Sequence, residues 1–359
     1  MPTSRVAVLG SFRPERGGTI DELEIAFRTW GTPVPARRPR NAVLVLHALT
    51  GDADAATWWN QVVGPGKPLD TDHWYVVSAN VLGGCSGSTG PATLAGDGRP
   101  WGSRFPAITI RDQVRAERRL ADHLGIDRFA AVLGGSMGGM RALEWGLSYP
   151  DRVGALLVLA TSAAASADQL GTQSTQVAAI TGDPHWQGGD YDRAGETPAY
   201  GLGIARRIAH LTYRSATELD LRFGRDQRDD EMFQVVSYLE HQADKLVGRF
   251  DAGSYVALTR AMDFHDVGRE RGGVGAALAR LRVPTVVAGV DSDRLYPLHQ
   301  QRELATAIPT AGPLRVITST YGHDGFLVEA GQVGAVVRET LDLAVGDRGG
   351  VHDAQRVAL

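Results

Sequence analysis

Residues 129–148, FAAVLGGSMGGMRALEWGLS, decide the fold. The apolar run at 129–133 is typical of a buried parallel strand, and residues 140–148 have the pattern of a helix. Between them, Gly134-Gly-Ser-Met-Gly138 matches G-x-S-x-G, which presents a serine on a sharp turn from strand to helix. We therefore expect Ser136 to adopt a strained backbone with positive φ. Glycine makes up 44 of the 359 residues, so the motif alone is weak evidence, but its setting makes Ser136 the candidate nucleophile.

Strand-like apolar runs recur on both sides of this stretch and alternate with helical patterns. Strands are predicted over 42–46, 74–79, 129–133, 155–160, 285–290 and 314–317. Helices are predicted over 110–124, 140–148, 298–307 and 332–345. This alternation indicates an α/β fold around a mostly parallel central sheet.

The alternation fails between Ser162 and Gly272. Residues there show no strand pattern and are predicted to form helices over 167–181, 200–211, 231–249 and 254–263. We interpret this segment as a helical lid inserted into the α/β core. The predicted divisions are a first core part, 1–162, the lid, 163–272, a second core part, 273–345, and a loose polar tail, 346–359.

Composition excludes several classes of protein. Hydrophobic residues make up 43% and charged residues 22%, which is typical of a globular protein. The net charge of −4 provides no basic surface for nucleic acid. One cysteine, Cys85, fits a reducing compartment. The N-terminus has no signal-peptide pattern, and the longest apolar stretch, 153–165, is too short for a membrane helix. We expect a cytoplasmic protein that binds neither nucleic acid nor membrane.

A nucleophilic serine needs an imidazole base that is oriented by a carboxylate. After a G-x-S-x-G motif these partners follow in the order acid, then histidine. Asp293 comes after the run 285–290 and His323 after the run 314–317, so each lies just beyond the end of a predicted strand. Asp291 competes for the role of the acid, whereas the rival base His299 falls on a predicted helix. The ten histidines show no pattern of a catalytic metal site.

Acyl transfer also needs two hydrogen-bond donors for the oxyanion. One is normally the amide after the nucleophile, here Met137. The other comes from the loop after an earlier strand, and within residues 47–50 we favour Leu49. The glycine-rich loop 83–90 lacks the Lys-Ser/Thr ending of a phosphate-binding P-loop, so we interpret it as a structural loop at the mouth of the site.

Together these motifs resemble the homoserine O-acetyltransferase family of the α/β-hydrolase fold. The resemblance covers nearly the whole chain, including the predicted lid. It is carried by HALTGD at 47–52, NVLGGCSGSTGP at 80–91, GGSMGG at 134–139, ALEW at 142–145, YLEHQ at 238–242, RFD at 249–251, AMD at 261–263, SDRLYP at 292–297 and YGHDGF at 321–326.

The resemblance implies transfer of an acyl group from acyl-CoA to the side-chain hydroxyl of L-homoserine, a step toward methionine. Acetyl-CoA would be a co-substrate, and no bound cofactor or metal is implied. The resemblance also assigns the acid to Asp293, which precedes Leu-Tyr-Pro, rather than to Asp291.

Four further positions match homoserine contacts of the family: Thr50, Arg206, Tyr213 and Asp324. The chemistry fits, because a guanidinium binds the carboxylate of an amino acid and a carboxylate binds its ammonium group. Arg206 and Asp324 would supply these two charges.

The leading hypothesis is a ping-pong acyltransferase with an acyl-Ser136 intermediate. A succinyl donor is an alternative, and so is an esterase or thioesterase that lets water attack the acyl-enzyme. A lid favours transfer because it can hold water away. A catalytically inactive scaffold is disfavoured by the retained serine, acid and histidine. The apolar side chains within 231–263 exceed what a thin lid would bury, which predicts a homodimer through the lid.

Overall fold

The computed structural model describes residues 4–35, 40–191, 195–229 and 231–346. At its centre is an eight-stranded sheet in the order β1-β2-β6-β3-β7-β8-β11-β12. From β6 to β12 neighbouring strands run parallel, whereas β2 pairs antiparallel with both β1 and β6. The strands are β1 (Arg5–Val8), β2 (Glu24–Trp30), β3 (Ala42–Leu46), β6 (Tyr75–Ala79), β7 (Phe129–Gly135), β8 (Val153–Leu159), β11 (Thr285–Val290) and β12 (Arg315–Ile317). The predicted α/β fold with a mostly parallel sheet is confirmed.

The central strands are covered on both faces, which explains their unbroken apolar runs. Every residue of β3, β7, β8 and β11 is buried. Successive residues point to opposite faces, so Val43 and Leu44 belong to different hydrophobic clusters. One face is covered by α2 (Ile110–His123), α3 (Met137–Ser148), α9 (Val274–Leu278) and α10 (Leu298–Ala307), and the other by α1 (Ala55–Trp58), α11 (Gly325–Val328) and α12 (Ala330–Gly346).

The N-terminal edge of the sheet is not predicted by the sequence pattern. β1 is short, and three of its four residues are exposed, so it contains no apolar run. β2 includes Arg28 and Thr29 among its apolar residues, which weakens its strand pattern. A separate pair of short strands, β4 (Val63–Gly64) and β5 (Leu69–Asp70), lies outside the main sheet.

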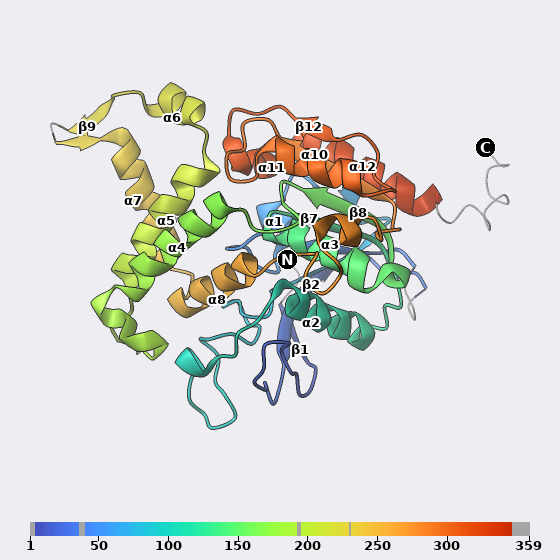
Figure 1. Ribbon diagram of the computed structural model, residues 1–359, viewed down its shortest axis with the longest axis horizontal. Helices are drawn as coiled ribbons and strands as arrows, with labels where there is room; N and C mark the ends of the chain where they lie inside the picture. The colour runs from blue at the N-terminus through green and yellow to red at the C-terminus, as the bar shows by residue number, and fades with distance from the viewer. Residues whose placement is uncertain (1–3, 36–39, 192–194, 230, 347–359) are drawn as a thin grey trace.

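The part of the chain that follows β8 and precedes β11 forms a layer of helices, which lies beside the sheet, on the left in Figure 1. Its helix α5 packs between α4 and α7. The helices are α4 (Ala167–Thr181), α5 (Ala199–Tyr213), α6 (Ala216–Phe223), α7 (Gln234–Val247) and α8 (Ala252–Asp263). No helix in the described part of the chain is both long enough and apolar enough to cross a membrane.

The prediction that this layer contains no strand is wrong. The segments β9 (Gln227–Asp229) and β10 (Met232–Phe233) form a small antiparallel hairpin. Each is too short to contain the alternating pattern that identifies a strand. Helix α6 is also absent from the prediction, although the Ser215 hydroxyl caps its first turn.

The limits assigned to the lid, 163 and 272, stay predictions. Of the predicted tail, 346–359, the described residues include only Gly346, which ends α12. The rest of the tail lies outside the described residues.

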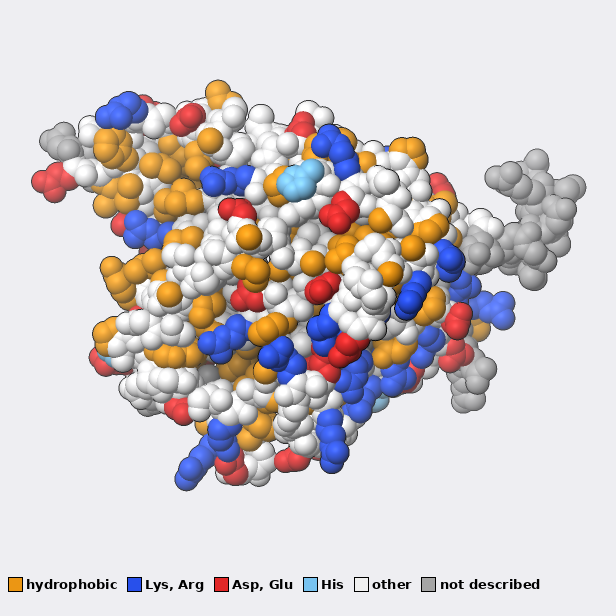
Figure 2. Space-filling view, viewed as in Figure 1, with side chains coloured by type: hydrophobic (Ala, Val, Ile, Leu, Met, Phe, Trp, Pro, Cys, Tyr) orange, Lys and Arg blue, Asp and Glu red, His pale blue; other side chains and the backbone are white. Residues whose placement is uncertain are grey.

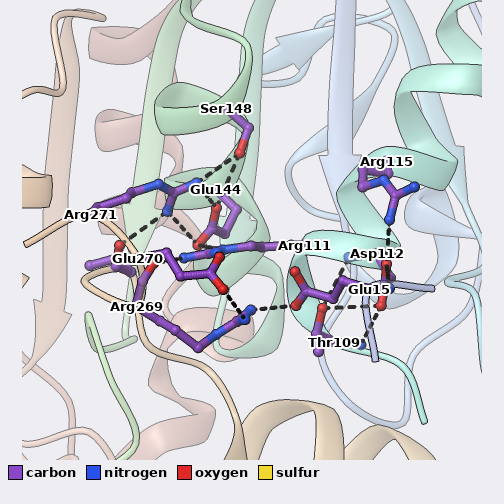
Figure 3. Close-up of polar contacts among 11 residues, drawn as sticks. Glu15, Thr109, Arg111, Asp112, Arg115, Glu144, Ser148, Arg269, Glu270 and Arg271 are labelled. Atoms are coloured by element: carbon purple, nitrogen blue, oxygen red, sulfur yellow. Dashed lines mark hydrogen bonds and ion pairs between the residues drawn. The ribbon is translucent and has the colours of Figure 1, made fainter. Parts of the chain in front are cut away.

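An ionic network fastens the segment after the lid helices to the core (Figure 3). Glu144 on α3 is 1% exposed and accepts hydrogen bonds from Arg271 at 2.8 and 2.9 Å. Arg111 on α2 also contacts Glu144, at 3.3 Å. Arg269 pairs with Glu15 in the N-terminal segment. Residues 269–271 are thereby tied to two helices of the core.

Candidate active site

Ser136 lies on the sharp turn between β7 and α3. Its φ of 58° and ψ of −126° confirm the expected positive φ. Close backbone contacts require glycine two residues before Ser136 and two residues after it. A Cβ on Gly134 would lie 2.0 Å from the Gly138 carbonyl oxygen, and a Cβ on Gly138 would lie 2.2 Å from that of Leu46. Ser136 is 6% exposed, so the turn lies in a nearly closed site.

His323 and Asp293 are in direct contact. His323 lies on the short 3-10 helix η4 (Gly322–Asp324), and its Nδ1 is 2.7 Å from Asp293 Oδ2. The other carboxylate oxygen of Asp293 accepts hydrogen bonds from two backbone amides of its own loop. Asp291 instead accepts a hydrogen bond from the Ser319 amide at 3.0 Å. The geometry therefore pairs the imidazole with Asp293 and not with Asp291.

The environment of His323 favours protonation of its ring. Burial by itself would lower the pKa of His323, but the charge and the hydrogen bond of Asp293 outweigh burial and raise it. Since Nδ1 faces the carboxylate, Nε2 is the nitrogen left to exchange a proton with a substrate or with Ser136.

Two aromatic side chains connect the Ser136 turn with His323. The Phe326 ring lies 5.2 Å from the imidazole, and a Cβ on Gly135 would lie 2.8 Å from the same ring. The Tyr296 ring is also 5.2 Å from the imidazole, and the Ser136 side chain interacts with its phenol. The predicted nucleophile and base therefore lie in one site.

Both predicted oxyanion donors lie beside this turn. Met137 is the first residue of α3, and Leu49 is in the turn that follows β3. Leu46, at the end of β3, is paired with Gly134, which brings the two segments together. Within the described residues, neither the Leu49 nor the Met137 N–H donates a hydrogen bond. Both groups remain available to a ligand.

Three of the four predicted homoserine contacts lie together. Arg206 on α5 has its Nη1 3.5 Å from Thr50 Oγ1, and its guanidinium lies 5.7 Å from the centre of the Tyr213 ring. The Tyr213 ring is 5.9 Å from the imidazole of His323. Helix α5 therefore brings a phenol to His323 and a cation to that phenol.

The fourth predicted contact, Asp324, is already paired with a residue that the sequence analysis missed. Arg214 Nε lies 3.1 Å from Asp324 Oδ2, and Arg214 also lies 3.6 Å from the buried Glu218. Burial raises the pKa of Asp324, although Arg214 opposes the shift. The available signal was a basic residue directly after Tyr213, which would have suggested a carboxylate partner.

Residues 213–215 of the lid are clamped onto the loop that carries His323. The Ser215 hydroxyl donates a 2.5 Å hydrogen bond to the Thr320 carbonyl oxygen. Gly322 has φ 68°, and a Cβ there would lie 2.6 Å from the Tyr213 carbonyl oxygen. We call this contact between 213–215 and 320–324 the lid clamp.

The glycine-rich loop packs as part of the scaffold. The Ser88 hydroxyl accepts a hydrogen bond from the Ala26 amide of β2. Burial raises the pKa of Cys85 to about 11, which favours the protonated thiol near pH 7. Cys85 and Arg249 line a cavity of about 300 Å³. Arg249, to which the RFD motif assigned no role, donates a 2.9 Å hydrogen bond to the Thr50 carbonyl oxygen.

No group of three or more His, Cys, Asp or Glu side chains within the described residues is arranged to hold a metal ion. The rival base, His299, lies exposed on α10, whereas Ser136 and His323 are buried. The structure brings together a serine on a strained turn and a His–Asp pair, the groups that nucleophilic acyl transfer uses.

Comparisons with known proteins identify the family of the chain. The family model described as alpha/beta hydrolase fold matches residues 41–330. A homoserine O-acetyltransferase from Nocardia farcinica is 56% identical over 362 residues, which cover 96% of this chain and 94% of the relative.

Two solved structures have the same fold. A homoserine O-acetyltransferase from Bacillus anthracis has a TM-score of 0.88 at 22% identity, covering 95% of this chain and 98% of that one. An acetylester hydrolase from Corynebacterium glutamicum has a TM-score of 0.84 at 28% identity, covering 95% and 96%. With the fold, the serine turn and the sequence identity taken together, the chain belongs to the homoserine O-acetyltransferase family of α/β-hydrolase-fold enzymes.

Proposed function

We propose that this enzyme transfers an acetyl group from acetyl-CoA to the side-chain hydroxyl of L-homoserine through an acyl-Ser136 intermediate. The observation that carries the proposal is the position of Arg206 and Tyr213 on the lid, next to the His323–Asp293 pair. A site for an amino acid thus adjoins a site for acyl transfer.

In the first half-reaction, His323 Nε2 takes the proton of the Ser136 hydroxyl as Oγ attacks the thioester carbonyl carbon. The oxyanion is stabilised by the Leu49 and Met137 N–H groups. The carbon–sulfur bond then breaks, and the proton passes from His323 to the departing thiolate. Coenzyme A leaves, and the acetyl ester of Ser136 remains.

In the second half-reaction the homoserine hydroxyl attacks this ester while His323 accepts its proton. Arg206 binds the carboxylate of homoserine, with Thr50 and Tyr213 beside it, and Asp324 binds the ammonium group. Collapse of the intermediate returns the proton to Ser136 and releases O-acetylhomoserine. No bound cofactor takes part in either half-reaction.

Mass spectrometry of the products tests both the donor and the acceptor. The protein is incubated with acetyl-CoA or succinyl-CoA and with L-homoserine or L-serine. We expect O-acetylhomoserine as the main product. A succinyl product would show that the donor is succinyl-CoA, and O-acetylserine would show that the acceptor is L-serine.

Hydrolysis is the second candidate function. It is supported by the similarity to the acetylester hydrolase from Corynebacterium glutamicum. The same assay with an acetyl ester, with and without homoserine, separates the two functions. Release of acetate at an equal rate in both conditions would favour an esterase.

We also propose that the enzyme is a homodimer through the lid. Of the apolar residues within 231–263, Tyr255 and Leu258 are fully buried inside the chain, so they cannot form an interface. Hydrophobic side chains nevertheless gather over α7 and the β9–β10 hairpin, at the upper left of Figure 2. The most exposed large apolar side chains of the lid are Tyr200 and Leu221, at 78% and 77%.

Light scattering at micromolar concentration tests the dimer. We expect about twice the mass of one chain, 38.4 kDa, and Leu221→Asp should shift the mass toward the monomer. A monomeric wild-type protein would contradict the proposal.

A further inference from the structure

A buried ion pair joins the helix after Ser136 to the rest of the core. Arg141 on α3 has no exposed surface, and its Nη1 donates a 2.5 Å hydrogen bond to Oε1 of Glu117 on α2. The other oxygen of Glu117 accepts a 2.9 Å hydrogen bond from the Trp145 indole. Glu117 is itself 3% exposed. Both carboxylate oxygens are therefore hydrogen-bonded, one to the Arg141 guanidinium and the other to the Trp145 indole.

Stability alone does not account for this pair. Burial raises the pKa of Glu117 and lowers that of Arg141, so the site disfavours both charges. Replacing a buried ion pair by well-packed neutral side chains is often neutral or stabilising. The presence of the pair therefore points to something else that Arg141 contacts.

Arg141 also contacts the start of the loop that carries Leu49. Arg141 Nη2 donates a short hydrogen bond to the carbonyl oxygen of His47, the first residue after β3. Burial lowers the pKa of His47 to about 3, and Arg141 adds to this shift, so the ring is neutral. Its Nε2 accepts a hydrogen bond from the Val81 amide, and Nδ1 therefore carries the proton and donates to the Ala48 carbonyl oxygen at 2.7 Å.

The same helix thus holds both sides of the oxyanion hole. Met137 supplies its N–H at the start of α3, and Arg141 lies one helical turn further along. From there it anchors the loop that supplies the N–H of Leu49. We propose that Arg141, oriented by Glu117, is a positioning residue that sets the spacing of the Leu49 and Met137 N–H groups. The inference rests on the proposed function only in requiring a tetrahedral oxyanion at Ser136.

The chain offers a matched control on the same helix. Glu144 is as deeply buried as Glu117 and is also held by arginines, Arg271 and Arg111. As Figure 3 shows, this network extends toward residues 269–271. Glu144 has no contact with the loop 47–50. Glu144→Gln therefore disturbs a comparable ionic network without touching an oxyanion donor.

The test compares Glu144→Gln with the double variant Arg141→Met/Glu117→Gln, which removes both charges and leaves no unpaired ion. Three quantities are measured: kcat, KM for acetyl-CoA, and the affinity for a trifluoromethyl ketone that forms a tetrahedral adduct with Ser136. Removing one oxyanion donor outright costs about 10²- to 10³-fold in kcat, so displacing it should cost about tenfold.

For the double variant we expect kcat and affinity for the ketone to fall by the same factor, with KM unchanged. Glu144→Gln should lower Tm and leave all three quantities near those of the wild type. Arg141 is merely structural if the double variant lowers Tm but keeps kcat and affinity for the ketone. The ketone needs neither acetyl-CoA nor homoserine, so this arm remains decisive even if the proposed substrates are wrong.

Discussion

The central strands of the core are apolar, whereas the helices of the lid bury polar side chains. The buried strands β3, β7 and β8 contain only aliphatic, aromatic and glycine residues. In α4 of the lid, by contrast, Gln169, Gln173 and Gln176 are buried. Gln176 accepts a 2.7 Å hydrogen bond from the Tyr255 phenol, and Gln169 donates one of 2.7 Å to the Leu295 carbonyl oxygen, two residues after Asp293.

This difference separates two ways of holding a functional group. The turn that carries Ser136 is held by close packing of backbone atoms, which leaves space only for glycine at positions 134 and 138. The lid side of the site is instead held by directional polar contacts, such as Arg206 with Thr50. We therefore expect changes in the core to remove the chemistry and changes in the lid to alter recognition of the acceptor.

The largest expected effect is that of Ser136→Ala. Without the hydroxyl no acyl-enzyme forms, and kcat should fall by roughly 10⁵-fold. Intact-protein mass spectrometry after exposure to acetyl-CoA should show no added acetyl group, while thermal unfolding shows that the variant folds. A variant that keeps a tenth of the wild-type rate would show that Ser136 is not the nucleophile.

The next effect distinguishes two aspartates of the same loop. Asp293→Asn should lower kcat by roughly 10³- to 10⁴-fold, because an amide supports neither the required tautomer of His323 nor its charge. Asp291→Asn is the matched control, since an amide oxygen can still accept the hydrogen bond from Ser319. If Asp291→Asn proves to be the more damaging change, the acid has been assigned to the wrong residue.

Arg206→Ala tests the lid directly. The first half-reaction needs no acceptor, so we expect a full burst of coenzyme A from this variant. Turnover with homoserine should fall by about 30- to 1000-fold, since one charge-assisted contact is worth on the order of 2–4 kcal/mol. Arg206→Lys should recover little, because an ammonium group lacks the bidentate geometry. Loss of the burst with normal dependence on homoserine would instead assign Arg206 to the donor.

The smallest effect is a shift in pH dependence. The base must be neutral, and the pKa of His323 lies above its ordinary 6.5. The rate of the first half-reaction should therefore fall as the pH drops through a value above 6.5. In Asp293→Asn, only the charge of Asp324 still opposes burial, so the pKa of His323 should fall and the residual activity should decline at a lower pH than in the wild type. If the pH at which the rate is half its maximum is the same in both proteins, a group other than His323 controls the loss of rate at low pH.

Sequence patterns predict the core better than the lid for a physical reason. Strands buried on both faces consist of apolar runs, so β3 and β11 are predicted with their observed limits. The ends of such strands also indicate where Asp293 and His323 lie, and the structure places them 2.7 Å apart. Their catalytic roles stay predictions.

Side chains that depend on tertiary contacts carry no such pattern. Arg214 looks like any polar residue at a helix end, and only the fold brings it to Asp324. Arg141 reads as a solvent-facing residue of a helix, yet it is completely buried. Edge strands such as β1 are equally hard to predict, because most of their residues face solvent.

The lid clamp couples the position of residues 213–215 to that of His323. Ser215 binds the carbonyl oxygen of Thr320, and Gly322 leaves no space between the two segments. A movement of residues 213–215 away from the core must either break these contacts or carry His323 away from Ser136. In the second case the opened site would admit water while His323 is displaced, so an acyl group on Ser136 would survive until the lid closes again. With its contacts intact, the clamp would act as an interlock between opening of the lid and hydrolysis.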